Sequence, residues 1–395
     1  MNKTLEDKPD FSLVLGGPLF QLFRRAHLVG DGLELARRRV AVIALLAWLP
    51  LLIFALPGGH ALGGGIKIPF LYDIEVHVRF LVALPILIAG ELIVHSRIRP
   101  AVNRFVERHI IAPEQIPEFH AAIKSAMRVR SSLFVELTLM ILVYPLGFWI
   151  WSTQIASGVP SWYSMSGGSH LQQLTLAGYW YVFISLPIFQ FILLRWYLRF
   201  LVWFWFLWRI SRLDLRLHAT HPDRAAGLGF LSSASYAFAP ILFAQGAMLS
   251  GLIANRVLYD GHDLISYKMQ AAGLVVFFMF FILSPLLVFS PHLSQAKRRG
   301  LSDYGELGSR YVEAFDRKWI AGKRSSDEEL LGTGDIQSLA DLGNSFGVVA
   351  ETRLVPFGVK DLARLAAATA APLLPLGLTI LSLEELVSRL IKILL

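Results

Sequence analysis

Two glutamates lie inside apolar stretches of this 395-residue chain, and carboxylates in such surroundings can bind a cation or carry a proton. Glu91 precedes Arg97 by about two helical turns, and Glu136 lies about one turn into the following apolar stretch. If both stretches cross a membrane, the two carboxylates share one depth. A structural alternative pairs Glu91 with His95, one turn further on, and lets an arginine neutralise Glu136. The candidate arginines are Arg128, Arg130 and Arg195.

Further polar side chains fall at a similar depth in the neighbouring apolar stretches. These are Gln190, Ser235 and Tyr236, whereas Gln245 is an exception in the opposite half. Because polarity is concentrated toward one side, the pattern predicts a water-filled vestibule open to the cytoplasm. The residues of the predicted ion or proton pathway are Glu91, His95, Glu136, Gln190, Ser235, Tyr236 and Gln245.

Five arginines recur on one side of the segment that continues the fourth apolar stretch. They are Arg195, Arg199, Arg209, Arg212 and Arg216. At about 100° per residue they fall within an arc of about 140°, mostly opposite aromatic side chains. This basic face predicts a helix that rests on anionic lipid headgroups. Voltage sensing is the alternative, but the spacing is irregular and the arginines follow the apolar run.

A weak candidate for metal binding comprises His218, His221 and Asp223. Pro222 interrupts any helix that would align the two histidines, so we favour a solvated loop in which Asp223 caps the next helix. We expect no metal and no cofactor. The chain has no cysteine, no phosphate-binding glycine loop and no nucleophile elbow, so we also expect no enzyme activity.

Six apolar stretches are long enough to cross a bilayer as helices and must position these side chains. They cover residues 40–56, 77–94, 133–151, 176–194, 228–254 and 270–289. Loops rich in lysine and arginine alternate with loops that are poor in them: 1–39 and 96–131 hold seven each, whereas 153–174 hold none. Short basic loops stay in the cytoplasm. The sequence therefore predicts a cytoplasmic amino terminus, and we expect a bacterial inner membrane.

The remaining segments complete the predicted organisation. Residues 1–39 form a cytoplasmic interfacial segment with a short apolar stretch at 11–23, and the transmembrane domain covers 40–292. Cytoplasmic helices cover 97–131 and 195–224, and a cytoplasmic helical segment covers 293–362. Residues 363–395 hold a seventh span or re-entrant segment, at 365–383, and an amphipathic tail. Arg79 begins the second span, where we expect it to snorkel to the outer headgroups.

Each of the six predicted spans contains a proline, which bends a helix. The six are Pro50, Pro85, Pro145, Pro187, Pro240 and Pro285. Their similar spacing suggests three tandem two-helix hairpins. Because proline is common in membrane helices, chance is an alternative explanation.

Composition supports a membrane protein. Apolar residues make up 55% of the chain and charged residues 17%, where soluble domains carry about 25% charged residues. The net charge of +8 clusters beside apolar runs, so we expect membrane lipids as partners, not nucleic acid. The predicted fold is an all-α, polytopic transmembrane helical bundle of six or seven spans with amphipathic cytoplasmic helices. Self-association is one way to bury the apolar stripe of the tail, so a homo-oligomer is considered.

Two functions stay open from the sequence. One is translocation of an ion or small solute through a proline-kinked helical bundle. The other is a non-transporting membrane scaffold or sensor that binds a partner through its cytoplasmic segment. A continuous polar path from Glu91 past Gln245 favours the first, and a closed apolar layer favours the second.

Overall fold

The computed structural model of the chain describes residues 11–18, 21, 36–63, 65–155, 161–165, 173–322 and 333–379. These residues are mainly helical. The α-helices are α2 (Ala36–Ala55), α3 (Ile74–His77), α4 (Leu84–Glu107), α5 (Ile116–Arg130), α6 (Leu133–Ile155), α7 (Leu176–Trp180), α8 (Leu186–Ile210), α9 (Phe230–Ser235), α10 (Ala239–Tyr259), α11 (Lys268–Leu283), α12 (Ser290–Phe315), α13 (Asp335–Ala350) and α14 (Val359–Ala370). The short strands β1 (Ser164–Met165) and β2 (Gln173–Leu174) pair antiparallel.

Short 3-10 and π segments join several of these helices into longer rods. The π segments are η3 (Val78–Ala83), η5 (Tyr181–Ser185) and η9 (Asp316–Ile320). The 3-10 segments are η2 (Phe70–Tyr72), η4 (Pro113–Gln115), η6 (Tyr236–Phe238), η7 (Leu264–Tyr267), η8 (Ser284–Phe289) and η10 (Ala371–Thr379).

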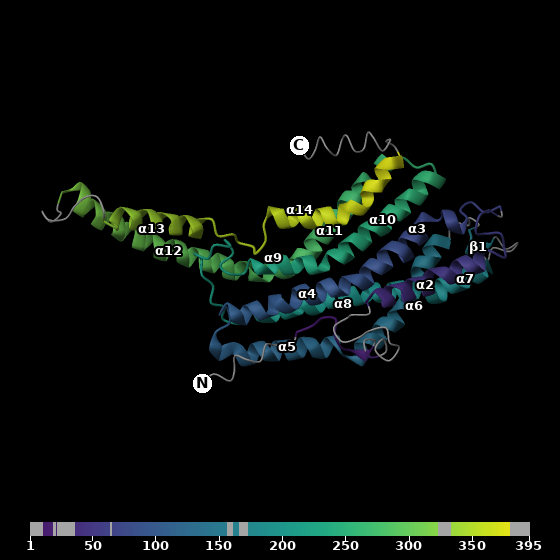
Figure 1. Ribbon diagram of the computed structural model, residues 1–395, viewed down its shortest axis with the longest axis horizontal. Coiled ribbons are helices and arrows are strands. Elements are labelled where there is room, and N and C mark those ends of the chain that lie inside the picture. The colour runs from purple at the N-terminus through teal and green to yellow at the C-terminus, as the bar shows by residue number, and fades with distance from the viewer. Residues whose placement is uncertain are drawn as a thin grey trace.

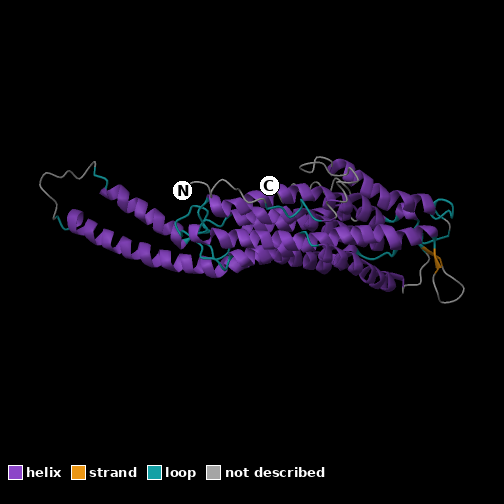
Figure 2. Cartoon of the chain, turned by 90° about the horizontal axis from the view of Figure 1, so that it is seen from below, coloured by secondary structure: helices purple, strands orange, loops and turns teal. Residues whose placement is uncertain are grey.

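The long helices run side by side in one elongated bundle, and the hairpin of α12 and α13 projects beyond one end of it (Figures 1 and 2). We call α12, η9 and α13 the arm, the end of the bundle from which they project the arm end, and the end that carries β1 the far end. The rod from Leu264 to Ile320 contains 57 residues. At 1.5 Å per residue it is about 85 Å long, so it joins the bundle to the arm without a break.

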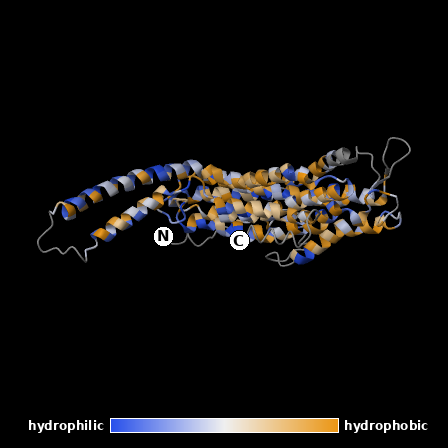
Figure 3. Cartoon of the chain, turned by 90° about the horizontal axis from the view of Figure 1, so that it is seen from above, coloured by the Kyte–Doolittle hydropathy of each residue, from blue (hydrophilic) through white to orange (hydrophobic). Residues whose placement is uncertain are grey.

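Among the residues that the structure describes, five helices are long and apolar enough to cross a membrane. They are Ala36–Ala55, Ile74–Glu107, Leu176–Ile210, Phe230–Tyr259 and Leu264–Ile320. The predicted third span coincides with α6, which meets the same criteria only together with Pro113–Arg130, from which Leu133–Gly147 is bent by 42°. The count is therefore five, or six with this bent pair. Figure 3 shows that hydrophobic residues predominate along the bundle, whereas the arm is mixed. These helices are compatible with a multi-pass integral membrane protein.

The predicted seventh span is not among these helices in the described part of the chain. Residues 359–379 form α14 and η10, which pack along α10, and α14 also packs on α11. The last residues of that predicted span and the amphipathic tail lie outside the described residues. Whether 365–383 crosses a membrane stays a prediction.

The proline pattern has a structural counterpart in two of the three proposed hairpins. A π segment, η3, ends two residues before Pro85, and another, η5, ends two residues before Pro187. Proline removes a helical hydrogen bond, and π bulges relieve such local irregularities. Pro285 instead lies inside the 3-10 segment η8, so the third hairpin departs from the pattern.

The amino-terminal apolar stretch is packed inside the bundle at its beginning. Phe11 and Val14 are 0% and 3% exposed, and the Phe11 ring lies 4.7 Å from that of Phe206 on α8. Arg130 donates to the carbonyl oxygens of Ser12 and Leu15, which holds this segment on α5. The prediction of an interfacial position is therefore wrong for 11–15, because helix packing offers these side chains a drier site than the headgroups.

Candidate functional site

Glu91 lies midway along the rod from Ile74 to Glu107, where two arginines from other helices meet its carboxylate. Arg39, in the first turn of α2, lies 2.5 Å from Oε2, and Arg199 of α8 pairs with Oε1. The side chains of Arg39, Glu91 and Arg199 are 2%, 12% and 4% exposed. A buried charge is tolerated when it is paired, so this contact ties three helices together.

Close helix packing brings these groups together. A Cβ at Gly90 would lie 2.5 Å from Pro240 Cβ on α10 and 2.9 Å from the Trp196 ring on α8, so glycine permits the approach. The Trp196 indole nitrogen donates to the Leu87 carbonyl oxygen at 3.0 Å. Its ring centre lies 5.6 Å from the Arg199 guanidinium carbon, a cation–π distance. The small residue beside Glu91 thus sets the position of the arginine that neutralises it.

The second predicted carboxylate, Glu136 on α6, lies 3.7 Å from the guanidinium of Arg195 on α8. Their side chains are 9% and 12% exposed. The predicted neutralisation of Glu136 by Arg195 is confirmed. The predicted pair of Glu91 and His95 is wrong, because the arginines occupy the carboxylate and His95 Nδ1 lies 3.1 Å from Ser12 Oγ. We call Arg39, Glu91, Glu136, Arg195 and Arg199 the mid-bundle cluster.

The structure does not gather the other predicted pathway residues into one site. Ser235 donates to the Leu231 carbonyl oxygen within its own helix, at 3.3 Å, and Tyr236 donates to the Asp361 carboxylate near α14. Gln245 donates to the Tyr197 hydroxyl at 2.9 Å. Gln190 is 4% exposed, and its amide has no hydrogen-bond partner among the described residues. The shared depth predicted from the sequence therefore does not become a continuous polar path.

The five arginines of the predicted membrane-surface face divide into two groups. Arg195 and Arg199 are buried in the mid-bundle cluster, so their assignment to the headgroups is wrong: α8 stays packed within the bundle and supplies them with carboxylates. The other three are exposed toward the arm end. They are Arg209 and Arg212, whose guanidinium carbons lie 5.6 and 4.9 Å from the rings of Trp205 and Trp208, and Arg216, 3.5 Å from Glu114.

A polar cluster at the far end was missed by the sequence analysis. Asp73 is 7% exposed and accepts hydrogen bonds from the Trp162 indole and the Asn255 amide, both at 2.8 Å. Its other contact, from the Val76 backbone nitrogen, caps α3. Two loops and helix α10, which lie far apart in the sequence, thus converge on one carboxylate.

Arg79 belongs to the same far-end cluster. It is 6% exposed, pairs with Glu75 one turn earlier, and donates to the hydroxyl of Tyr181. The prediction that Arg79 snorkels to headgroups is wrong, because a carboxylate and a phenol inside the bundle bind its two terminal guanidinium nitrogens. We call Asp73, Glu75, Arg79, Trp162, Tyr181 and Asn255 the far-end cluster. The ion pair of Glu75 and Arg79 could have been predicted from the sequence, because residues four apart lie next to each other on a helix.

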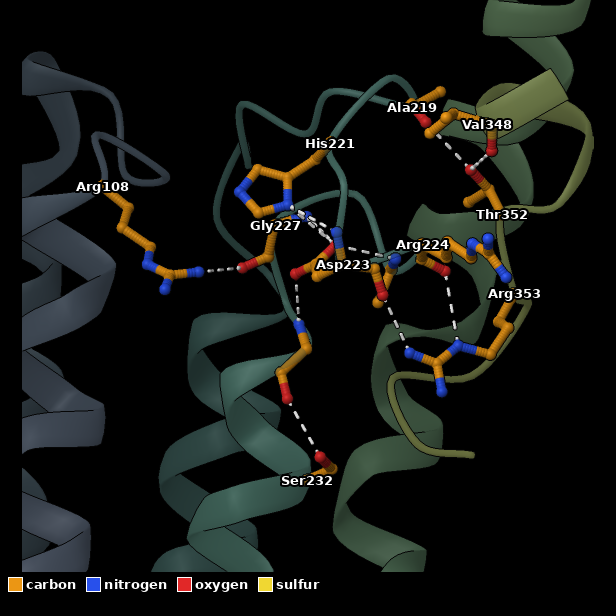
Figure 4. Close-up of polar contacts among 12 residues, drawn as sticks. Arg108, Ala219, His221, Asp223, Arg224, Gly227, Ser232, Val348, Thr352 and Arg353 are labelled. Carbon is orange, nitrogen blue, oxygen red and sulfur yellow. Dashed lines mark hydrogen bonds and ion pairs between the residues drawn. The ribbon is translucent and has the colours of Figure 1, made fainter. Parts of the chain in front are cut away.

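The third loop, residues 211–229, lies at the arm end and contains the weak metal candidate (Figure 4). Asp223 accepts backbone hydrogen bonds from Ala225, Gly227 and Gly229 at 2.8 to 3.1 Å, and its Oδ1 lies 2.9 Å from His221 Nδ1. The predicted capping role is wrong: Gly229 is the N-cap of α9 and no side chain caps this helix, whereas Asp223 accepts from the Gly229 N–H just ahead of it. No group of three or more potential metal ligands comes together within the described part of the chain.

The hydrogen bonds to Asp223 also affect its acidity. Burial alone raises the pKa of this carboxyl, but the backbone N–H groups of Ala225, Gly229 and Gly227, together with His221, bring the pKa below its ordinary value. The ionised carboxylate is therefore part of the folded loop.

The same loop connects the bundle with the base of the arm. Thr352, just after α13, donates to the Ala219 carbonyl oxygen at 2.9 Å, and Arg353 donates to the Asp223 carbonyl oxygen at 2.9 Å (Figure 4). A Cβ at Gly300 of α12 would lie 2.7 Å from Ala219 Cβ, so this glycine lets the loop touch the arm. We call residues 211–229 the collar loop.

Comparison of the chain with protein families finds no family that matches it. Comparisons with curated proteins and with solved structures find no match either.

Proposed function

We propose that this protein is a non-transporting membrane scaffold or sensor, which holds its arm in the cytoplasm for a binding partner. The observation that carries the proposal is the arm itself, a helical hairpin that continues a membrane-compatible rod and projects beyond the bundle (Figure 1). Beyond Gly300 on α12 and before Val349 on α13, none of the described arm residues is buried. An element this exposed on a rigid stalk is suited to contact another molecule.

The collar loop supports a sensing role. It contacts α12 at Gly300 and the chain after α13 at Thr352, and it leads directly into α9 of the bundle. A shift of α9 or α10 is therefore passed to the base of the arm through short contacts rather than a flexible linker. Rigid elements with such contacts can bias the position of a projecting hairpin.

Translocation of a cation or proton receives less support. Glu91 is neutralised by two arginines, and Glu136 faces a third, so neither carboxylate is free to exchange a cation. On the same rod, about two turns of buried apolar side chains lie between the mid-bundle cluster and the far-end cluster. These are Phe80, Ala83, Leu84 and Leu87, each 0% exposed. This closed apolar layer is the feature that favours a scaffold.

The orientation forms part of the proposal. The loops 96–131 and 195–224, which are rich in lysine and arginine, lie at the arm end (Figure 1), and this supports an arm in the cytoplasm with Arg209, Arg212 and Arg216 near anionic headgroups. A bacterial inner membrane fits this arrangement.

Affinity purification tests the proposal. The full chain is compared with a variant in which residues 301–348 are replaced by a short glycine–serine linker, at equal amounts in the membrane. We expect a specific protein, either a second tagged copy or a different polypeptide, to co-purify with the full chain and not with the variant. Identical co-purified proteins from both, or none from either, contradict the proposal. Cation-driven flux in liposomes that Glu91→Gln and Glu136→Gln abolish also contradicts it.

A further inference from the structure

Two arginines from helices that lie far apart in the sequence meet at the ring of Tyr236, the first residue of η6. The guanidinium carbon of Arg97 on α4 lies 5.9 Å from the ring centre, and that of Arg364 on α14 lies 5.7 Å from it. Both are cation–π distances. Both arginine side chains are exposed. One half-buried aromatic ring therefore holds two cations side by side at the surface of the bundle.

Positive charge is in excess around this ring. Asp361, one turn before Arg364, accepts hydrogen bonds from the Tyr236 hydroxyl and from the Gly358 backbone N–H, the latter at 2.7 Å. Neither Arg97 nor Arg364 forms an ion pair with any residue that the structure describes. One carboxylate thus stands against two guanidinium groups, and its oxygens already serve other donors. The surface here is complementary to an anion.

Both arginines lie where an apolar stretch of the sequence ends. Arg97 follows the predicted span 77–94 by about one helical turn, and Arg364 directly precedes the apolar stretch 365–383. Tyrosine, arginine and lysine are typical of the level at which a membrane helix leaves the hydrocarbon. In a multi-pass arrangement of these helices, the two guanidinium groups therefore lie at the level of the lipid phosphates.

Apolar side chains continue from both arginines toward the far end. On α4 and along α14 into η10, they lie on the same helix faces as Arg97 and Arg364, at about 100° per residue. The exposed or half-buried members of these two stripes are Ile86, Ile93, Ala367 and Ala371. Helices α4 and α14 both pack on α10, which lies between them (Figure 1). The two stripes thus flank one helix, below a shared basic group.

We infer that Arg97 and Arg364, positioned by the Tyr236 ring, bind the phosphate of one anionic phospholipid, whose acyl chains lie along the exposed faces of α4 and α14. Guanidinium groups donate charge-assisted hydrogen bonds to phosphate oxygens, and basic pockets between membrane helices bind anionic headgroups. The excess positive charge favours phosphatidylglycerol over phosphatidylcholine, because the choline cation is repelled. The inference goes beyond the proposed scaffold and does not depend on the partner of the arm.

Native mass spectrometry of the purified full chain in detergent tests the inference. Phosphatidylglycerol and phosphatidylcholine are titrated separately, and the lipid adducts of each chain are resolved by mass. We expect one phosphatidylglycerol adduct that binds at least about tenfold more tightly than any phosphatidylcholine adduct. The double substitution Arg97→Gln and Arg364→Gln weakens it at least about tenfold, because the phosphate loses both charged donors. The matched control, Arg209→Gln with Arg212→Gln, removes the same charge from other exposed arginines and leaves this adduct unchanged.

Each outcome decides the inference. A selective adduct that only the Arg97 and Arg364 substitutions weaken supports it. Equal affinity for the two lipids, or an equal loss in both double variants, overturns it, because either result shows general attraction of charge. Unchanged binding after substitution of Arg97 and Arg364 also overturns it. If inorganic phosphate at the lipid concentration displaces phosphatidylglycerol, the site takes free phosphate, and the lipid is overturned as occupant. The assay contains no partner of the arm, so a negative result leaves the proposed scaffold standing.

Discussion

The bundle and the arm use the same chemical pair, glutamate with arginine, in opposite surroundings. In the bundle, Glu91 and its two arginines are nearly inaccessible, at 12%, 2% and 4% exposed. In the arm, the side chains of Arg310 and Glu306 are 75% and 64% exposed. A buried pair fixes the helices that supply it, because losing one partner leaves a charge without compensation, whereas an exposed pair mainly keeps a surface soluble. The bundle thus buries paired charges between helices, whereas the arm keeps its charges at the surface.

The largest contrast is expected from removing one carboxylate in each region. Glu91→Gln leaves Arg39 and Arg199 buried with less compensating charge and is expected to destabilise the bundle by about 3 to 5 kcal/mol. Glu306→Gln removes one exposed partner of a pair four residues apart, with an expected loss of about 0.3 to 0.5 kcal/mol. Thermal unfolding of the purified chain in detergent measures both. Equal losses in the two variants contradict the contrast between the regions.

A smaller effect is expected from glycine substitutions. A Cβ at Gly246 of α10 would meet the Thr369 carbonyl oxygen well inside van der Waals contact, and backbone cannot give way cheaply. Gly246→Ala is therefore expected to destabilise by about 1 to 3 kcal/mol. At Gly308 in the arm a Cβ meets nothing within 4 Å, so Gly308→Ala is expected to stabilise by up to about 1 kcal/mol. If Gly246→Ala is neutral in the same unfolding assay, the tight contact of α10 with the last turn of α14 is not present.

The collar loop predicts a modest effect that depends on pH. The pKa of Asp223 is below its ordinary value of 3.8, so its ionised form stabilises the fold fully above about pH 4, and this stabilisation is lost as pH falls through the lowered pKa. Asp223→Ala is expected to cost about 1 kcal/mol near neutral pH, because three backbone N–H groups lose their acceptor, and progressively less below the ordinary pKa. Unfolding curves of wild type and variant between pH 7 and pH 3 measure this convergence.

Asp214, exposed in the same loop, provides the control. Asp214→Ala is expected to leave stability unchanged throughout the pH range. A gap between wild type and Asp223→Ala that stays constant down to pH 3 shows that the loop's hydrogen bonds to Asp223 do not depend on its ionisation.

The helical bundle was predictable from sequence because its cause is local. Runs of about 20 apolar residues must form helices in lipid, and loops such as 96–131 with many arginines mark one side. The contact of Asp223 with the backbone that leads into α9 is local for the same reason, since it requires only the next few residues, although the helix cap itself is Gly229. Helix α6 shows the limit of prediction from composition. Its apolar residues predicted a span, but the bend between α5 and α6 depends on how the helices pack.

The side-chain partners were less predictable because they are distant in the sequence. Glu91 meets Arg199 across 108 positions, and Arg79 meets Tyr181 across 102. A helical wheel placed Arg199 on a surface face because it does not show how far α8 stays within the bundle. Asp73 was not predicted as a site residue because it lies in a loop between two predicted spans. Its partners, Trp162 and Asn255, come close to it only after folding.

Hydrogen–deuterium exchange of the full chain in a lipid bilayer tests the central claim most directly: the bundle is self-sufficient, whereas the arm requires a partner. The account predicts that α13 amides of the purified chain exchange at least about tenfold faster than amides of α4 around Glu91. If α13 is as protected as α4, the arm is stable without a partner and the claim is contradicted.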